Sequence, residues 1–136
     1  MDTRDLYEKG LKLRREMLGT EAVDARMDAM GAFGAPLQDI INAYAYGDVW
    51  SRRALPLATK SLAMIAMMAG CGRSNELRVH VKGALRNGCT PEQIQDILLL
   101  VAMYCGIPAA IEPNRIAAEI FGSDPAAASD AAKEGS

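Results

Sequence analysis

The sequence is poor in the residues that support redox and disulfide chemistry. Its 136 residues include one histidine and three cysteines, and no two cysteines have the C-x-x-C spacing of a redox dithiol. Cys71, Cys89 and Cys105 are an odd number, which fits a reduced cytoplasmic chain better than a disulfide framework. We therefore expect a fold that is held together by its core and not by covalent cross-links.

An excess of charge and a long apolar run are also missing. The 15 Lys and Arg residues nearly balance 17 Asp and Glu residues, so the net charge is -2 and no overall positive field attracts nucleic acid or anionic lipid. The longest uncharged stretches, 61–72 and 97–111, are shorter than the ~18 residues of a membrane-spanning helix. The first ten residues lack the apolar segment of a signal peptide. We expect no nucleic-acid or membrane partner, and a cytoplasmic location.

Runs that alternate apolar and polar residues, as in strands, are absent, whereas helical spacing recurs along the whole chain. The sequence predicts an all-α fold of about six helices, with one domain over residues 1–122 and a tail of small and polar residues over 123–136 that we expect to be disordered. The first expected helix ends at Gly19, and residues 20–34 are expected to form a short helix and a loop. Further helices are expected at about 36–47, 55–69 and 73–87, from Pro91 after a Thr90–Gln93 capping box, and from Pro108 or Pro113 to Phe121. Residues 48–55 are expected to form a loop that carries the only tryptophan.

The helix expected at 55–69 is apolar on nearly every side. Such a helix needs cover all round, and a chain of this size can rarely enclose it alone. We therefore expect self-association, because a second copy of the chain supplies the missing cover.

The single histidine defines the main candidate for chemistry. His80 follows Glu76 by four residues on the predicted 73–87 helix, so both side chains project from one face. The positive end of the helix favours the Glu76 anion, and a neighbouring carboxylate favours a charged imidazole that can donate a proton. The alternative is a solvated i,i+4 pair without a function.

Arginines cluster near these residues and near the tryptophan. Arg52 and Arg73 are candidate anchors for the carboxylates of an anionic substrate, and Trp50 either lines the pocket or fills the core. We expect Arg53 and Arg78 to be ordinary surface residues. Cys71 follows a helix and precedes another, but without a second thiol nearby we discount it as a nucleophile. Cys89 and Cys105 are expected to be small buried side chains.

Four segments together resemble one family. They are G-D-V-W-S-R at 47–52, E-L-R-V-H-V-K-G-A-L at 76–85, N-G-C-T-P-E-Q-I at 87–94 and Y-C-G-I-P-A-A at 104–110. In this order and spacing they resemble the carboxymuconolactone decarboxylase family, and within it the branch that acts on 4-carboxymuconolactone. The E-x-x-x-H-x-x-x-A-L segment is shared by a broader superfamily, whereas G-D-V-W-S-R together with G-I-P-A-A is more specific to the decarboxylase branch.

The resemblance implies an all-helical fold of the alkylhydroperoxidase D type that assembles into a homohexamer, or a trimer. It implies loss of CO2 from 4-carboxymuconolactone to give the β-ketoadipate enol-lactone, in the protocatechuate branch of aromatic catabolism, without a metal or an organic cofactor. His80 would then be the general acid or oxyanion stabiliser with Glu76 as its partner, and Arg52, Arg73 and Trp50 would bind the substrate.

The sequence also departs from the family pattern. Peroxidase relatives carry a C-x-x-C motif immediately before the histidine, where this chain has Arg73 and Glu76, and this excludes thiol peroxidase chemistry. Ser51, Arg52 and Arg53 are followed by Ala54 and Leu55, where the decarboxylase pattern has proline and glycine after the arginine. A paralogue that acts on a related lactone or β-keto acid, a non-catalytic helical oligomer that binds a small carboxylate, and a hydrolase or isomerase on the same scaffold remain alternatives.

Overall fold

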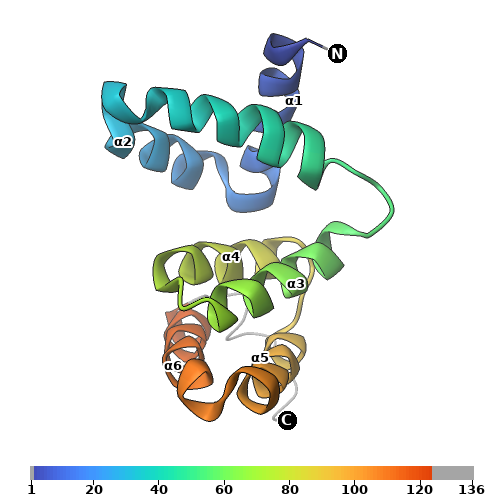
Figure 1. Ribbon diagram of the computed structural model, residues 1–136, viewed down its shortest axis with the longest axis vertical. Helices are drawn as coiled ribbons and strands as arrows, with labels where there is room; N and C mark the ends of the chain where they lie inside the picture. The colour runs from blue at the N-terminus through green and yellow to red at the C-terminus, as the bar shows by residue number, and fades with distance from the viewer. Residues whose placement is uncertain (1, 124–136) are drawn as a thin grey trace. The chain divides into compact units, whose positions relative to one another are not determined.

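The computed structural model describes residues 2–123, and all regular structure in that range is helical (Figure 1). The all-α prediction is therefore confirmed, whereas the expected disordered tail lies outside the described residues except for Ser123. In chain order the elements are α1 (Thr3–Leu18), α2 (Thr20–Ile40), the π-helical segment η1 (Ile41–Trp50), α3 (Leu57–Gly70), α4 (Ser74–Arg86), α5 (Pro91–Cys105) and α6 (Ile107–Ser123).

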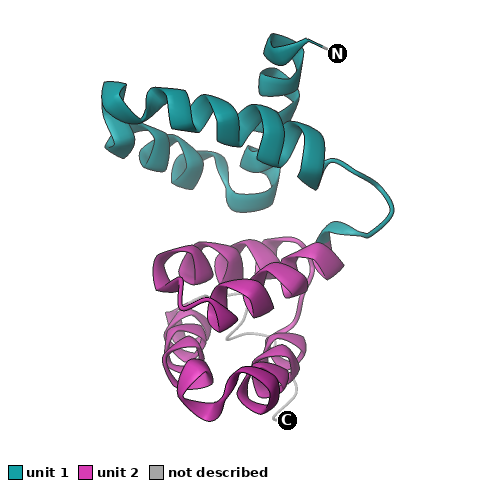
Figure 2. Cartoon of the chain, in the orientation of Figure 1, with its two compact units in different colours: residues 1–57 teal, residues 58–136 magenta. Residues whose placement is uncertain are grey.

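The described residues form two compact units, which divide the chain between residues 57 and 58 (Figure 2). The first unit contains α1, α2 and η1, and the second contains α3 to α6. None of the helices in residues 2–123 combines the length and the apolar character needed to cross a membrane.

Helix α1 has a side-chain cap at its start and ends where the sequence predicts. The Asp2 side chain caps the helix by accepting a hydrogen bond from the Asp5 backbone nitrogen at 2.9 Å. At the other end Gly19 adopts a φ of 97°, which a residue with a side chain rarely adopts. The predicted stop at Gly19 is confirmed.

The break expected within 20–34 is present, whereas the next predicted boundary is wrong. The backbone of α2 is interrupted at Gly31, with φ 61° and ψ -162°, so α2 consists of two helical runs, and the second of them contains Pro36 (Figure 1). The helix then passes into η1, where the backbone hydrogen bonds run from residue i to i+5. Trp50 is consequently the last residue of a helix and does not lie in a loop.

Two glycines let α1 and η1 approach until their backbones touch. A Cβ atom added at Gly10 would overlap the carbonyl oxygen of Asn42, and one at Gly47 would overlap the carbonyl oxygen of Leu6. In a π-helix residues i and i+5 are linked by a backbone hydrogen bond, so Asn42 and Gly47 lie close together. Both of them lie against Gly10. The contact fixes α1 against η1.

The second unit encloses the larger apolar core. Its fully buried members include Ile65, Leu77, Val81, Ile94, Leu98 and Ile116, which come from all four helices of this unit. The predicted capping box at the start of α5 is confirmed, because Thr90 Oγ1 accepts from the Gln93 backbone nitrogen while Gln93 Oε1 accepts from that of Thr90. Helix α6 starts one residue before Pro108 and carries Pro113 inside it.

Helix α3 is covered on one stripe only. Ser61, Ile65 and Ala69 are buried, while Ala63 is exposed and Met67 is 53% exposed. Among the described residues of the second unit, the other helices therefore cover α3 on one stripe and leave the rest of its apolar surface open.

Candidate active site

Helix α4 places Glu76 and His80 in different environments. Glu76 lies in the first turn, and its side chain is half-buried. His80 lies one turn further and is only 5% exposed. Leu77 and Val81 of the same helix are fully buried in the core and hold the helix in place. A shielded imidazole next to a carboxylate is a suitable proton donor.

Arg73 lies at the N-cap of the same helix, on a cavity of about 310 Å³. The cavity lies wholly within the second unit and is also lined by Ser74, Pro108 and Glu112. The Arg73 side chain is exposed and makes no capping hydrogen bond. Because the first backbone N–H groups of a helix lack intrahelical acceptors, this end of α4 together with Arg73 can accept an anion.

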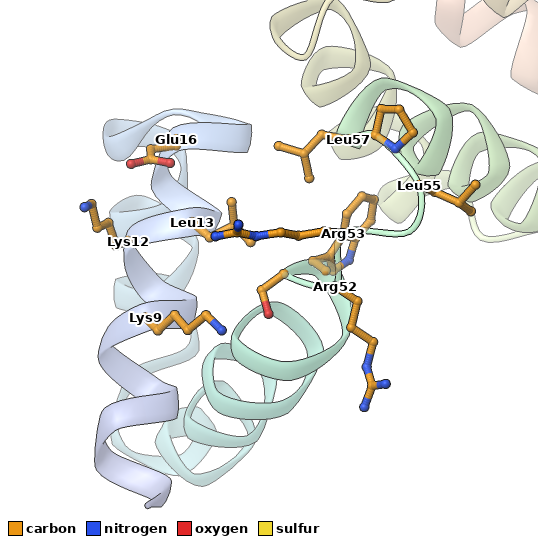
Figure 3. Close-up of a pocket in the computed structure, with 11 residues that line it drawn as sticks. Lys9, Lys12, Leu13, Glu16, Arg52, Arg53, Leu55 and Leu57 are labelled. Carbon is orange, nitrogen blue, oxygen red and sulfur yellow. The ribbon is translucent and has the colours of Figure 1, made fainter. Parts of the chain in front are cut away.

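A larger cavity, of about 540 Å³, lies in the first unit between α1 and the segment that follows η1 (Figure 3). Trp50 and Arg52, which the sequence suggested as substrate-binding residues, both line it. Four cationic side chains surround it, namely those of Lys9, Lys12, Arg52 and Arg53, together with a single carboxylate, Glu16. Its size is in the range that holds a small ligand.

Trp50 forms a fixed part of this wall. Its ring stacks on that of Tyr46, with centroids 6.0 Å apart and an interplanar angle of 11°. The next residue, Ser51, donates its hydroxyl to the backbone oxygen of Gly47 at 2.6 Å and so closes the end of η1. The sequence left open whether Trp50 lines a pocket or fills the core. In the structure Trp50 is half-buried and lines the pocket.

The two arginines after Trp50 point in different directions. Arg52 Nη2 pairs with Asp48 Oδ1 at 2.9 Å, one turn back, and the side chain points away from α1 (Figure 3). Arg53, expected to be an ordinary surface residue, is exposed but extends toward α1 beside Leu13 (Figure 3). Both residues line the cavity, and Arg53 is the one that reaches across it.

Arg14 is a buried residue of the first unit that was not among the predicted site residues. Its side chain is 2% exposed, and Nη1 donates to Gln38 Oε1 at 2.8 Å and to Asn42 Oδ1 at 3.0 Å. The guanidinium also lies 5.4 Å from the centre of the Tyr46 ring. The same ring stacks on that of Trp50. The available signal was its spacing, because Gly10, Arg14 and Met17 form one buried stripe of α1.

Arg78, the other arginine expected at the surface, binds Glu119 of α6 at 3.2 Å, and both side chains are partly exposed. Among the thiols, Cys89 is buried as predicted, and burial raises its pKa. The prediction of a buried Cys105 is wrong, because the buried stripe of α5 ends at Val101 and the chain turns at Gly106. Within residues 2–123 no three His, Cys, Asp or Glu side chains are grouped so that they could hold a metal ion.

The predicted site residues thus form two groups. Trp50 and Arg52 meet at the cavity of the first unit. Arg73, Glu76 and His80 lie along the first two turns of α4 in the second unit. A buried histidine one helical turn from a glutamate is suited to acid–base chemistry, and each of the two cavities by itself has cations at its edge that suit a small anion.

Comparison with known proteins agrees with that class. The model of the carboxymuconolactone decarboxylase family matches residues 35–133. The 4-carboxymuconolactone decarboxylase of Acinetobacter baylyi is 35% identical over 121 residues, which cover 89% of this chain and 90% of the relative. A nitrosuccinic acid decarboxylase of Metarhizium robertsii is 36% identical over 109 residues, covering 80% of this chain and 76% of the relative.

A third relative matches over a shorter segment. Peroxisomal protein 2 of Schizosaccharomyces pombe is 38% identical over 84 residues, covering 58% of this chain and 39% of that protein. The first two matches and the family model decide the assignment. The chain belongs to the carboxymuconolactone decarboxylase family, as its motifs suggested, and its enzyme class is that of the carboxy-lyases.

Proposed function

We propose that this enzyme decarboxylates 4-carboxymuconolactone to the β-ketoadipate enol-lactone, in the protocatechuate branch of aromatic catabolism, without a metal or organic cofactor. The observation that carries the proposal is the burial of His80, 5% exposed, one turn after the half-buried Glu76. Support for the substrate comes from the Acinetobacter baylyi relative, which matches 89% of the chain.

The reaction needs a place for an electron pair and a proton. The bond between the ring and the departing carboxylate breaks, CO2 leaves, and the electron pair spreads through the unsaturated ring to the oxygen of the lactone carbonyl. The resulting dienolate is then protonated at carbon. In this proposal charged His80 stabilises the developing oxyanion or delivers the proton, and Glu76 keeps the imidazole charged and oriented.

The remaining residues would bind the substrate. Arg52 and Arg73 are proposed as partners of its carboxylates, because guanidinium groups hold carboxylates in a fixed geometry. Trp50 would lie against the ring, and its stacking on Tyr46 supports this role because it holds the indole in one orientation. Leu77 and Val81 of α4 are fully buried in the core, and apolar walls of this kind would favour release of charge from the departing carboxylate.

A related substrate is the second candidate. The Metarhizium robertsii relative is named for nitrosuccinic acid and is about as similar to this chain as the first relative, at 36% identity. Activity on another lactone or a β-keto acid would keep the same roles for His80 and Glu76, because these substrates also leave an enolate that must be protonated.

We also propose that the protein is a homohexamer, or a trimer, in the cytoplasm. The assembly is supported by a group of exposed apolar side chains on α5 and α6 in the second unit, at Leu99, Leu100, Met103, Tyr104, Ile107 and Ile111. Analytical ultracentrifugation tests the assembly. The exchange of Tyr104, 86% exposed, for lysine should reduce the sedimenting mass, whereas Gln95→Lys on the same helix should not.

The function is tested by incubating purified, metal-free protein with 4-carboxymuconolactone and following ring absorbance and CO2 together. Turnover supports the proposal, and turnover of a related lactone or β-keto acid alone supports the second candidate. Binding of the whole panel without CO2 release would show a non-catalytic carboxylate-binding protein. Product mass separates a hydrolase or an isomerase from a decarboxylase.

A further inference from the structure

The cavity of the first unit is cationic although the protein as a whole is not. The chain has a net charge of -2, yet four cations and a single carboxylate line this cavity. Clustering cations in a chain with no net positive charge costs repulsion, which a bound anion would relieve. The cavity therefore has the electrostatic character of an anion site.

Lys9, Lys12 and Arg53 form no ion pair within residues 2–123, whereas Arg52 is paired with Asp48. Figure 3 separates the three: the Lys9 ammonium points toward the end of η1, Arg53 extends toward α1, and Lys12 points away from both. Lys9 and Arg53 thus face the same space from opposite sides.

The two cations are held by rigid elements. Lys9 precedes Gly10, where the backbones of α1 and η1 are in direct contact, so its Cα cannot move away from η1 without breaking that contact. Arg53 follows Trp50 and Ser51, which are fixed by the stack on Tyr46 and by the hydrogen bond to Gly47. The backbone near both cations is therefore fixed, and binding has to order only their exposed side chains.

The rest of the wall fits a carbon ring. Leu13, Trp50, Leu55 and Leu57 supply apolar surface next to the two cations. The carboxylate of Glu16 is two helical turns from Lys9, about 10 Å along α1, so it does not oppose an anion at the Lys9 end. A cationic edge beside an apolar wall suits a small ring that carries carboxylates.

From this arrangement we infer that Lys9 and Arg53 together bind a carboxylate of a small ring compound with two carboxylate groups, in the cavity lined by Trp50. The inference rests on the proposed function in taking the substrate as the natural ligand. It adds two binding residues, one of them on α1, to those proposed above for that substrate.

The test measures binding with an unreactive probe, isophthalate, which is a ring with two carboxylates. Isothermal titration calorimetry at low salt compares it with benzoate, which has one carboxylate, and with inorganic phosphate, which has no ring. We expect isophthalate to bind at least tenfold more tightly than either, and its affinity to fall as salt is added. Equal affinity for phosphate, or no binding of isophthalate at millimolar concentration, would overturn the inference.

The residues are tested by removing one charge at a time. Lys9→Gln and Arg53→Gln should each weaken isophthalate binding about tenfold, as expected for the loss of a charge-assisted hydrogen bond. Arg4→Gln is the matched control, because it removes a cation from an exposed position of the same helix and should leave the affinity within about twofold. All three side chains are exposed, so the variants should fold, which circular dichroism checks.

Kinetics with the lactone separates this inference from the proposed function. If the wild type releases CO2 and both charge variants raise KM with little change in kcat, both stand. If the wild type turns the lactone over and neither variant changes KM or isophthalate binding, the function stands and the inference fails. If isophthalate binds through Lys9 and Arg53 but no lactone is turned over, the inference stands and the function fails.

Discussion

The Arg14 guanidinium lies 5.4 Å from the centre of the Tyr46 ring, inside the first unit and 2% exposed to solvent. It donates hydrogen bonds to two side-chain amides, those of Gln38 in α2 and Asn42 in η1. Arg14 of α1 thus contacts α2, η1 and the stacked pair of Tyr46 and Trp50. Because Trp50 lines the cavity, Arg14 stabilises the wall of the candidate binding site.

Replacing Arg14 by methionine should therefore weaken the fold. The substitution keeps an apolar stem of similar length but leaves the buried amides of Gln38 and Asn42 without their donor, which should cost about 2–3 kcal/mol of unfolding free energy. Urea denaturation followed by circular dichroism measures the change. Arg4→Met is the control, because the pair of Arg4 with Glu8 is exposed and its loss should stay within about 0.5 kcal/mol. An equal effect of the two substitutions would refute the role given to Arg14.

The contact between α1 and η1 makes Gly10 sensitive to the smallest side chain. Gly10→Ala places a Cβ on the carbonyl oxygen of Asn42, and backbone must move to make room, so we expect a loss of about 3 kcal/mol. Gly122→Ala is the matched control in α6, where no atom lies within 4 Å of the added Cβ. Because alanine is the better helix former, Gly122→Ala should be neutral or stabilise by up to about 1 kcal/mol. A Gly10→Ala protein as stable as the wild type would show that the two helices are not in contact.

Acid stability should depend on Glu119. The hydrogen bond from Arg78 lowers the pKa of this carboxyl below its ordinary value of 4.5, so the folded protein keeps it ionised to lower pH than the unfolded chain does. The stability that this provides is present above pH 4.5 and is lost as the pH falls through the lowered pKa of the folded state. Glu119→Gln should remove this part of the pH dependence.

Urea unfolding at a series of pH values from neutral down to acid measures the Glu119 effect. Asp96→Asn, which removes a carboxylate from an exposed position of α5, should leave the profile unchanged. Since the Arg78–Glu119 pair is partly exposed, added salt should reduce the difference between the wild type and Glu119→Gln. Parallel profiles for these two proteins at low salt would contradict the prediction.

The helices of the second unit could be predicted from sequence because their ends carry strong local signals. Thr90 and Gln93 form the capping box that their spacing predicts, and Gly88 and Gly106 both have a φ of 100°. These signals act within a few residues of the chain, and tertiary contacts did not override them.

The first unit could be predicted less well because tertiary contacts decide it. Leu37, Ile40 and Tyr44 have the spacing of a core stripe, yet they are 47% to 55% exposed. The residues buried there are Gln38 and Asn42, which accept hydrogen bonds from Arg14, Tyr46, whose ring lies beside the same guanidinium, and the small Gly34, Ala43 and Gly47. A buried cation that bonds to side-chain amides has no periodic signature, and neither has the change to π-helical hydrogen bonding.

The candidate site was predicted in part. Helical spacing alone put Glu76 and His80 on one face, but only the structure showed that the histidine is buried. Trp50 and Arg52 do line one cavity, whereas the direction of Arg53 and the contribution of Lys9 depend on how α1 packs against η1. Sequence spacing says nothing about a neighbour that comes from a distant helix.

The central claim is that His80 takes part in the chemistry with Glu76 as its partner. Its most direct test is the rate of CO2 release from 4-carboxymuconolactone by the wild type and by His80→Ala and Glu76→Gln, each with an unchanged helical spectrum. We expect a fall in kcat of at least about 100-fold for each variant. Full activity in both variants would contradict the account.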